Sequence, residues 1–250
     1  GSPTGVVVIS NPQSDDDSMA ASGSKMYTLA TGLTASHTYT LVVWKATEDN
    51  SAQLSTTQGS NYFHSFVLPQ GSFLTPPPRL SRRLEFIGDS DTAGWCISSG
   101  STSSCPCSGN SYQTWAAQLS RRLQAEMRVQ AVSGWGIGAG AQPIQHVLDY
   151  TLGFALTSKW NYSSWTPDAV VILIGANDIE TELFVAAYLS LLNQVATNYA
   201  NAKPSPPQIV HVCAGSMSGL DRCANIQKAN DAFNRNTSTN RGMRGHFTRL

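Results

Sequence analysis

Residues 84–95 read Leu-Glu-Phe-Ile-Gly-Asp-Ser-Asp-Thr-Ala-Gly-Trp, and this stretch decides the fold. Its first half is apolar and strand-like, and it ends in Gly88-Asp89-Ser90. A serine in the first turn after a strand is placed to act as a nucleophile, because ligands of open α/β sheets bind beyond the carboxyl ends of the strands. Gly-Asp-Ser is a short motif, so its meaning depends on the motifs that come later in the chain.

After this stretch, strand-like and helix-like segments alternate. Nearly continuous apolar runs predict strands at 84–88, 128–132, 169–175 and 208–213, with a fifth at 242–250. Helices are predicted between them, at 111–126, 141–156, 180–201 and 221–235. This alternation predicts an α/β fold in three layers (α/β/α), with a parallel sheet between helices.

The first 75 residues have a different character. Segments 25–29, 38–44 and 61–68 are rich in Thr, Val, Tyr and Phe, which is typical of strands. Residues 76–83 begin with three prolines, which hold an extended backbone. The sequence therefore predicts a β domain at 1–75, a linker at 76–83 and the α/β domain at 84–250.

Charge is sparse and balanced along the chain. Lys plus Arg number 16, Asp plus Glu also number 16, and only 13% of the residues are charged. No basic field is present to attract nucleic acid or an anionic membrane, and no apolar run is long enough to span a bilayer. A polar but weakly charged surface is typical of secreted proteins that bind neutral ligands such as glycans.

Cysteines and glycosylation motifs also favour an oxidising, extracellular compartment. Two disulfides are expected among the five cysteines, Cys213–Cys223 and Cys96 with Cys105 or Cys107. A metal site at Cys105 and Cys107 is disfavoured, because the sequence has no second cysteine pair with accompanying histidines. We therefore expect no metal. The expected glycosylation acceptors are Asn161 and Asn236.

Three predicted strand ends carry the chemistry, and in a parallel sheet they meet at one edge. They are Ser90, Gly134 in Ser-Gly-Trp-Gly, and Asn177 in Gly-Ala-Asn-Asp. Acyl transfer needs a nucleophile, here Ser90, and donors for the developing oxyanion. The donors are expected to be the Ser90 N–H, the Gly134 N–H and the Asn177 amide. Asp89 and Asp178 are predicted to anchor the loops around this site.

Each of these motifs also has a purely structural explanation. Ser90 can be a helix N-cap, Gly134 a turn residue, and Asn177 with Asp178 an N-cap pair. Their order along the chain and their shared position at strand ends favour a catalytic site over these alternatives.

Gly-Asp-Ser, then Gly, then Gly-x-Asn-Asp resembles the motifs of the SGNH (GDSL-type) hydrolase superfamily, most closely carbohydrate esterase family two. The resemblance extends over Thr40–Glu48 (TLVVWKATE), Phe66-Val67-Leu68 and the linker. It implies a flavodoxin-like hydrolase domain preceded by a jelly-roll-like domain. It also implies removal of acetyl groups from polysaccharides or oligosaccharides, without metal or cofactor.

Two positions near the nucleophile depart from that family pattern. The family usually has an aliphatic residue where Asp91 stands and Tyr-Gly where Trp95-Cys96 stands. Both departures bear on the level of activity more than on the fold.

The general base that Ser90 needs is hard to find among the five histidines. Structural roles are expected for His37, His64, His146 and His211. His246 is the closest formal candidate, but it falls within the predicted fifth strand. The resemblance implies a catalytic histidine on the loop after that strand. We therefore expect the base to lie beyond Leu250, together with a partner for the fifth cysteine, and we expect the β domain to be incomplete as well.

The sequence thus favours a secreted, monomeric carbohydrate O-acetylesterase similar to acetyl-xylan esterases. One alternative is a lipase- or phospholipase-type esterase with a wider apolar cleft. Another is a non-catalytic protein that grips glycans with surface aromatics, expected to be Trp95, Trp135, Trp160 and Trp165.

Overall fold

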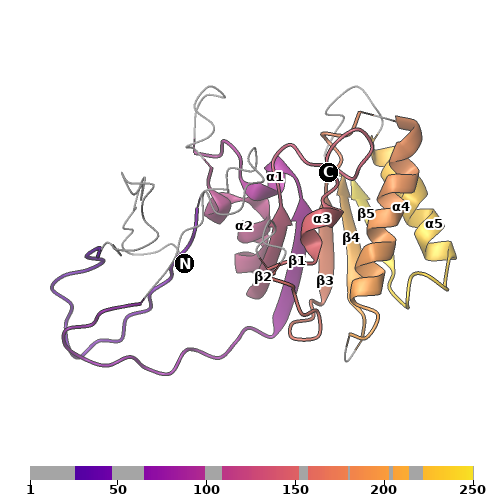
Figure 1. Cartoon of the computed structure of the whole chain (residues 1–250). Helices are drawn as coiled ribbons and strands as arrows, with labels where there is room; N and C mark the ends of the chain where they lie inside the picture. Colours follow the sequence, from indigo (N-terminus) through magenta and orange to yellow (C-terminus); the bar gives the residue numbers. More distant parts are fainter. Residues whose placement is uncertain are drawn as a thin grey trace. The chain divides into compact units, whose positions relative to one another are not determined.

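The computed structural model of the chain describes residues 26–46, 65–98, 109–151, 157–179, 181–202, 205–213 and 222–249. The chain divides into two compact units. The first comprises Gly1–Val43 and Asn61–Pro76, and the second comprises Trp44–Ser60 and Pro77–Leu250. Every helix and strand of the described residues belongs to the second unit (Figure 1).

A parallel sheet of five strands forms the centre of the second unit, in the order β2-β1-β3-β4-β5. The strands are β1 (Arg82–Gly88), β2 (Ala125–Ala131), β3 (Ala169–Leu173), β4 (Gln208–Cys213) and β5 (Gly245–Arg249). This order is that of flavodoxin-like doubly wound folds. The predicted parallel sheet, including its fifth strand, is confirmed.

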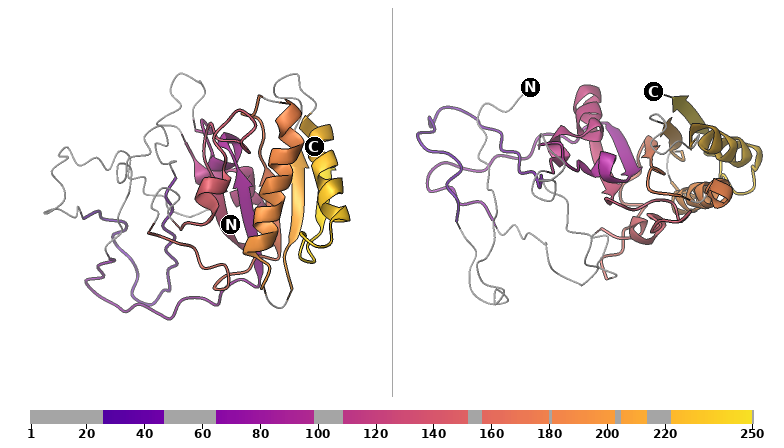
Figure 2. Two further views of the ribbon diagram at one scale, coloured as in Figure 1. Left: turned by 45° about the vertical axis from the view of Figure 1, so that its right-hand side comes forward. Right: turned by 90° about the horizontal axis from the view of Figure 1, so that it is seen from above.

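Helices cover both faces of the sheet (Figure 2). They are α1 (Ser90–Ala93), the 3-10 helix η2 (Ser111–Gln113), α2 (Trp115–Leu123), α3 (Gln145–Leu148), α4 (Thr181–Asn198) and α5 (Arg222–Arg235). Because side chains alternate along a strand, Phe86 of β1 packs with Ala116 of α2, whereas Ile87 packs with Leu191 of α4 on the other face. Burial on both faces explains why the strands read as continuous apolar runs.

The predicted helix at 111–126 is shorter in the structure. It begins as η2, and α2 ends at Leu123, where Gln124 takes a left-handed conformation with φ 50°. The Gln124 N–H then bonds to the carbonyl oxygens of Ser120 and Arg121. This early termination lets β2 start at Ala125, three residues before the predicted start.

The predicted helix at 141–156 is wrong for most of its described residues, because α3 spans only four. The preceding chain is a loop instead. Gly136 donates its N–H to the Gln142 carbonyl oxygen and accepts the N–H of Ile144, both at 2.8 Å. Pro143 between these two residues has no N–H to give to a helix. Residues 152–156 lie outside the described part of the chain.

The described residues of the predicted β domain, 26–46 and 65–75, are not assigned to any strand. Large apolar side chains there are exposed, for example Val42 and Phe73 at 67% each. The predicted strands at 25–29 and 61–68 fall partly outside the described residues. The jelly-roll-like domain therefore stays a prediction.

The disulfide Cys213–Cys223 is confirmed, and it joins the end of β4 to the first turn of α5. Cys96 is also disulfide-bonded, and its predicted partners, Cys105 and Cys107, lie outside the described residues. Among the described residues, no helix is long and apolar enough to cross a membrane. The same residues contain no cluster of three His, Cys, Asp or Glu side chains that could hold a metal ion.

Candidate active site

Ser90 is the first residue of α1, immediately beyond the buried end of β1. The turn between them is tight, since a Cβ on Gly88 would lie 2.1 Å from the Thr92 hydroxyl oxygen. This close approach explains the glycine of Gly-Asp-Ser. Asp89, and not Ser90, is the N-cap of α1, and its carboxylate accepts the N–H of Asp91 at 3.3 Å. The serine side chain is thus not needed as a cap.

The strand register brings three loop tips to one edge of the sheet. Gly88 of β1 pairs with Ala131 of β2 and with Leu173 of β3. Ser90, Gly134 and Asn177 follow these paired residues by two, three and four positions on three adjacent strands. Parallel strands end at the same edge, so the three tips lie at the edge of the sheet where ligands of open α/β folds bind.

Asn177 is oriented by the neighbouring loop. Its side-chain amide donates to the Trp135 carbonyl oxygen at 2.7 Å. A primary amide carries two hydrogens, so one holds the side chain in place. This contact fixes the direction of the Asn177 side chain relative to the loop that follows β2.

Asp178 is fully buried and ties the second and third loops together. Its carboxylate accepts the N–H of Ile137 at 3.0 Å and that of Ala139 at 2.8 Å. A Cβ on Gly136 would lie 2.2 Å from a carboxylate oxygen of Asp178, so only glycine fits there. These contacts fix the loop that starts at Gly134.

Gly134 itself needs glycine for a different reason. Its φ is +79°, in the left-handed region, although no atom lies within 4 Å of where a Cβ would stand. The residue is exposed. The backbone here is thus open on the side where an incoming group would approach.

Asp89 connects the first loop to the third, and it is only 2% exposed. Burial raises the pKa of its carboxyl to about 6, and the nearby Asp91 charge adds to the rise. Hydrogen bonds from the backbone N–H groups of Asp91, Gly175 and Ala176 lower the pKa and limit the shift. The pairs Asp89–Gly175 and Asp178–Ile137 therefore connect all three loops.

His246 is not brought to Ser90. It is exposed on β5, with Nε2 3.2 Å from Oε1 of Gln208. His246 pairs with Val210 of β4, which pairs with Val171 of β3, which pairs with Phe86 of β1. His246 is therefore level with Phe86 across the sheet. That position is four residues before Ser90, about 13 Å along the strand, and three strand spacings away, about 14 Å across the sheet.

The other described histidines have structural surroundings. His211 is buried, and its Nδ1 lies 3.1 Å from the Tyr188 hydroxyl. Burial lowers its pKa to about 4, so the ring is neutral near pH 7. His146 on α3 stands edge-to-face against Trp135 at 6.5 Å. His37 lies in the first unit, and His64 lies outside the described residues.

The sequence did not reveal the N–H groups of Ile137 and Ala139, because a backbone donor has no residue type of its own. The only signal was the glycine spacing at 134, 136 and 138.

The structure also corrects the expected aromatic surface. Trp135 and Trp165 are each only 8% exposed, and Trp160 is half-buried with the Arg128 guanidinium stacked on it at 4.1 Å. Of those four tryptophans, Trp95 alone is well exposed, at 43%.

Comparison with known proteins identifies the family. The model of the GDSL-like lipase/acylhydrolase family matches residues 86–241, which include all three loop tips. The chain belongs to this family. Ser90 is the serine of the Gly-Asp-Ser motif on which the resemblance to GDSL-type hydrolases was first based.

Two curated relatives of this GDSL-like chain are esterases. It is 35% identical over 210 residues to the cellulase/esterase CelE of Acetivibrio thermocellus, covering 78% of the chain and 24% of CelE. It is 29% identical over 155 residues to an acetylxylan esterase/glucomannan deacetylase of Cellvibrio japonicus, covering 50% of the chain and 42% of that enzyme. The chain thus spans less than half the length of either curated relative.

Solved structures of family two carbohydrate esterases share the fold. One, from Clostridium thermocellum in complex with cellohexaose, has a TM-score of 0.58 at 29% identity, over 71% of this chain and 57% of that one. Another, from Cellvibrio japonicus, has a TM-score of 0.57 at 18% identity, over 71% of this chain and 55% of that one. The second likeness concerns the fold alone.

Proposed function

We propose that this chain is the hydrolase portion of a secreted carbohydrate O-acetylesterase that acts through an acyl-enzyme on Ser90. The observation that carries the proposal is the hydrogen-bonded connection of three loop tips by Asp89, Asn177 and Asp178. Such fixed donors stabilise the charge that develops in acyl transfer without reorganising during the reaction. The names of the two curated relatives support the choice of acetylated carbohydrate as substrate.

In the proposed reaction, the Ser90 hydroxyl oxygen bonds to the acetyl carbonyl carbon while a base takes its proton. The carbonyl oxygen becomes an oxyanion that accepts the N–H of Ser90, the N–H of Gly134 and the second amide hydrogen of Asn177. The C–O bond to the sugar then breaks, and the sugar oxygen takes the proton from the base. Water, deprotonated by the same base, attacks the carbonyl carbon of the acetyl-serine. The bond from that carbon to the Ser90 oxygen breaks, the Ser90 oxygen takes the proton from the base, and acetate is released.

The general base is proposed to be an imidazole outside the residues that the structure describes. It has to reach the carboxyl edge of the sheet, where the five parallel strands end and Ser90 lies. Neither His211, which is buried and bound to Tyr188, nor His246, which faces Gln208, is directed to that edge. Asp91 is exposed, which fits a charge directed away from the oxyanion.

Secretion is part of the proposal. The disulfide Cys213–Cys223 suits an oxidising compartment. Asn161, in the turns before β3, and Asn236, directly after α5, are both exposed. They precede strands β3 and β5, so carbohydrate on either one would lie at the amino edge of the sheet, away from Ser90.

The test measures hydrolysis of 4-nitrophenyl acetate and acetylated xylan by the chain and by a form extended past Leu250. The protein that hydrolyses these esters is called the active form below. Ser90→Ala is expected to lower kcat/KM of the active form at least ~1,000-fold. Ser164→Ala, in an exposed turn before β3 and so at the opposite edge of the sheet from Ser90, is the matched control and should leave activity unchanged. Hydrolysis that survives Ser90→Ala contradicts the mechanism.

Histidine variants test the base. His146→Gln and His246→Gln are expected to retain full kcat/KM in the active form, because neither side chain is proposed to reach Ser90. Loss of activity in His146→Gln, with an unchanged circular dichroism spectrum, would assign the base to α3 and reject a base outside the described residues.

A lipase-type esterase is the second candidate, because large apolar side chains are exposed near the site loops. Ile179 is 72% exposed and Leu183 is 52% exposed, directly after Asn177 in the chain. A series of 4-nitrophenyl esters from acetate to decanoate separates the two. Highest kcat/KM on acetate supports the acetylesterase, whereas a preference for long acyl chains supports the lipase.

A further inference from the structure

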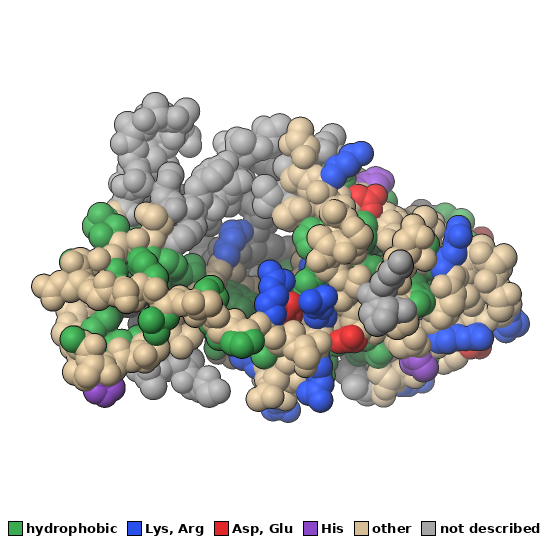
Figure 3. All heavy atoms as spheres, turned by 90° about the horizontal axis from the view of Figure 1, so that it is seen from below, with side chains coloured by type: hydrophobic (Ala, Val, Ile, Leu, Met, Phe, Trp, Pro, Cys, Tyr) green, Lys and Arg blue, Asp and Glu red, His purple; other side chains and the backbone are tan. Residues whose placement is uncertain are grey.

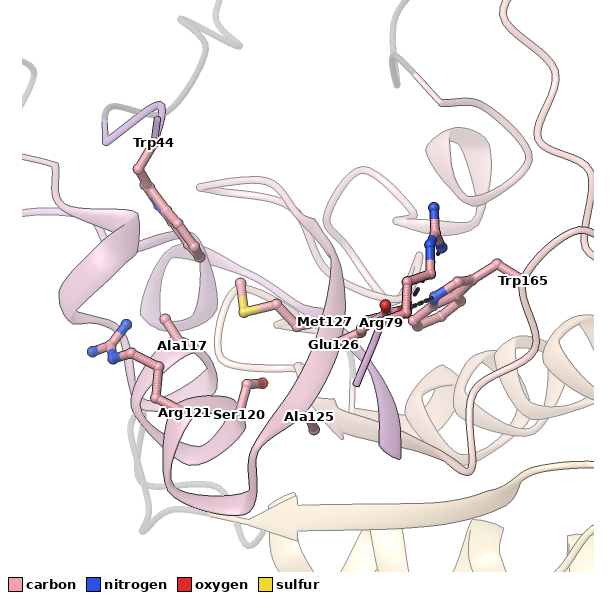
Figure 4. Close-up of a pocket in the computed structure, with 9 residues that line it drawn as sticks. All are labelled: Trp44, Arg79, Ala117, Ser120, Arg121, Ala125, Glu126, Met127 and Trp165. Atoms are coloured by element: carbon pink, nitrogen blue, oxygen red, sulfur yellow. Dashed lines mark hydrogen bonds and ion pairs between the residues drawn. The ribbon is translucent and has the colours of Figure 1, made fainter. Parts of the chain in front are cut away.

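A hollow of about 600 Å³ lies beside the amino end of β2, the edge strand of the sheet (Figure 4). It lies wholly within the second unit. Its floor includes Met127, which precedes Gly134 by seven residues. β2 ends at Ala131, four residues and about 13 Å beyond Met127, so this hollow, here called the edge groove, is separate from the Ser90 site.

One wall of the edge groove is the indole ring of Trp44, which is 38% exposed and projects toward Met127 (Figure 4). Its Nε1–H donates to the Ser111 hydroxyl at 2.7 Å, and that hydroxyl donates to the Lys45 carbonyl oxygen at 2.6 Å. The Tyr112 ring meets the indole edge-to-face at 5.2 Å. An exposed tryptophan held by these contacts is a rigid platform rather than a core residue.

On the other face of β2 the groove continues to an aromatic ring with paired charges. Glu126 and Met127 are consecutive in this edge strand, so their side chains lie on its opposite faces. The Trp165 indole N–H donates to Oε2 of Glu126 at 3.0 Å. The same oxygen lies 3.7 Å from the guanidinium groups of both Arg79 and Arg83. Figure 3, which views this edge of the sheet from below, shows basic and acidic side chains side by side. The carboxylate is therefore oriented and its charge is compensated.

The two parts of the groove fit successive sugars of a chain that crosses the edge strand. A pyranose ring presents C–H groups that pack on an indole face and hydroxyls that bond to carboxylate and guanidinium groups. Met127 provides an apolar floor. Arg121 lines the groove from α2, where its guanidinium donates to the Tyr112 carbonyl oxygen at 2.8 Å and stacks on the Tyr112 ring. We propose that the edge groove is a second glycan-binding site that holds an unacetylated stretch of a neutral polysaccharide chain.

The charges that line the groove are largely compensated. Arg79 is paired with Glu126 and the Arg121 guanidinium stacks on the Tyr112 ring at 4.1 Å, so one net positive charge is left among the lining residues. These residues include no cluster of basic side chains that would hold a polyanion, which favours a neutral ligand. The inference rests on the proposed function for its choice of a polysaccharide. A polymer that spans more than about 13 Å could occupy the groove and the Ser90 site together, which would raise the local concentration of acetylated units at the site.

Binding is tested with xylohexaose and cellohexaose by calorimetry on the Ser90→Ala protein, so that turnover plays no part. Trp44→Ala is expected to weaken binding of at least one hexaose ~10-fold, and Trp44→Phe, which keeps a ring face, should weaken it less. Arg121→Ala should also weaken binding. Arg122→Ala, the exposed neighbour on α2 that does not line the groove, is the matched control and should not.

The location of the bound sugar is read from the indole N–H resonances of the six tryptophans. The Trp44 signal is assigned by its loss in Trp44→Phe, and circular dichroism verifies that each variant is folded. Hexaose is expected to shift the Trp44 and Trp165 signals. Shifts confined to Trp95 and Trp135, with equal affinity in Trp44→Ala, would place the sugar at the Ser90 site and overturn the proposal.

Hydrolysis distinguishes failure of this inference from failure of the proposed function. In the active form, Trp44→Ala should raise KM for acetylated xylan ~10-fold while leaving 4-nitrophenyl acetate hydrolysis unchanged. Trp44-dependent binding without any Ser90-dependent hydrolysis would reject the esterase and keep the glycan site. Hydrolysis without Trp44-dependent binding would do the reverse. A concentration-dependent dimer lost in Trp44→Ala, with no hexaose shift, would assign the groove to a second copy of the chain and overturn the proposal.

Discussion

The two halves of the sheet are organised by different interactions. In the half formed by β2, β1 and β3, buried carboxylates accept backbone N–H groups across the loops, as Asp89 does from Gly175 and Asp178 does from Ala139. In the half formed by β4 and β5, the disulfide Cys213–Cys223 and the buried, neutral His211 hold the elements together. The first half therefore fixes the geometry of the loops around Ser90 with polar contacts, whereas the second half serves as a scaffold.

This comparison explains where function is expected. In the first half, hydrogen bonds to buried carboxylates fix the direction of each loop. The proposed oxyanion donors lie on these loops and are therefore concentrated in the first half. Covalent and apolar contacts in the second half hold its strands and helix in place but do not orient polar groups toward the site. Mutations that alter donors in the first half should therefore change activity, and mutations in the second half should change stability alone.

The largest effect is expected for Asn177. In the active form, Asn177→Ala removes one oxyanion donor, and kcat should fall about 100- to 1,000-fold with little change in KM. Asn177→Asp should be at least as damaging, because a carboxylate cannot donate and would oppose the oxyanion. Stopped-flow or steady-state assays on 4-nitrophenyl acetate measure this. Asn236→Ala, in an exposed turn after α5, is the control, and equal losses in the two variants would contradict the assignment.

The second prediction uses pH to separate the halves, because two buried groups have opposite linkage. The Asp89 pKa is raised from 3.8 to about 6, so its contribution to stability is present below pH 3.8 and is lost as pH rises through 6. The His211 pKa is lowered from 6.5 to about 4, so its contribution is present above pH 6.5 and is lost as pH falls through 4. Each shift corresponds to roughly 3 kcal/mol at full extent.

Urea unfolding between pH 3.5 and 8.5 measures both limbs. Between about pH 4 and 6.5 the two contributions change in opposite directions and partly cancel in the parent protein. Asp89→Asn removes the loss with rising pH, so its stability should rise more steeply with pH than that of the parent. His211→Gln removes the gain with rising pH, so its stability should fall as pH rises through this range. Each variant serves as the control for the other, since the two groups have opposite pH dependence and lie in different halves. Asp89→Asn with a profile parallel to that of the parent protein would show that burial does not perturb this carboxyl.

Much of the second unit could be predicted from the sequence, because strands buried on both faces leave continuous apolar runs. The run ending at Ile87 and the run at Ala169–Leu173 are examples. The α3 region could not, since its loop depends on two backbone hydrogen bonds of Gly136 that leave only a glycine as a sign. Tertiary contacts decided that segment.

The candidate site could be proposed from the sequence in its side chains, but not in its backbone groups. Ser90, Asn177 and Asp178 are read directly from residue types, whereas the N–H groups that Asp178 accepts are not. Aromatic exposure also could not be inferred. Trp165 is covered although it was expected at the surface, while Trp44, which the sequence placed in a strand, is an exposed wall of the edge groove.

The smallest effect is expected for the scaffold disulfide. Cys213 and Cys223 are 10 residues apart in sequence, and closing a loop of that length stabilises the native state by about 2.7 kcal/mol through the entropy of the unfolded chain. The double variant Cys213→Ala/Cys223→Ala should lower the free energy of unfolding by about this amount in urea titrations. Both side chains are buried, and alanine avoids leaving a polar thiol or hydroxyl in the core.

Activity measurements on the disulfide variant show whether its lower free energy of unfolding also affects the candidate site in the first half. If the second half is scaffold, kcat and KM of the disulfide variant in the active form should match those of the parent well below its unfolding temperature. The Asn177→Ala variant should show the inverse pattern, with full stability and low kcat. A disulfide variant that unfolds normally yet loses kcat as Asn177→Ala does would mean that the end of β4 helps to aim the catalytic groups, and the division between the halves would fail.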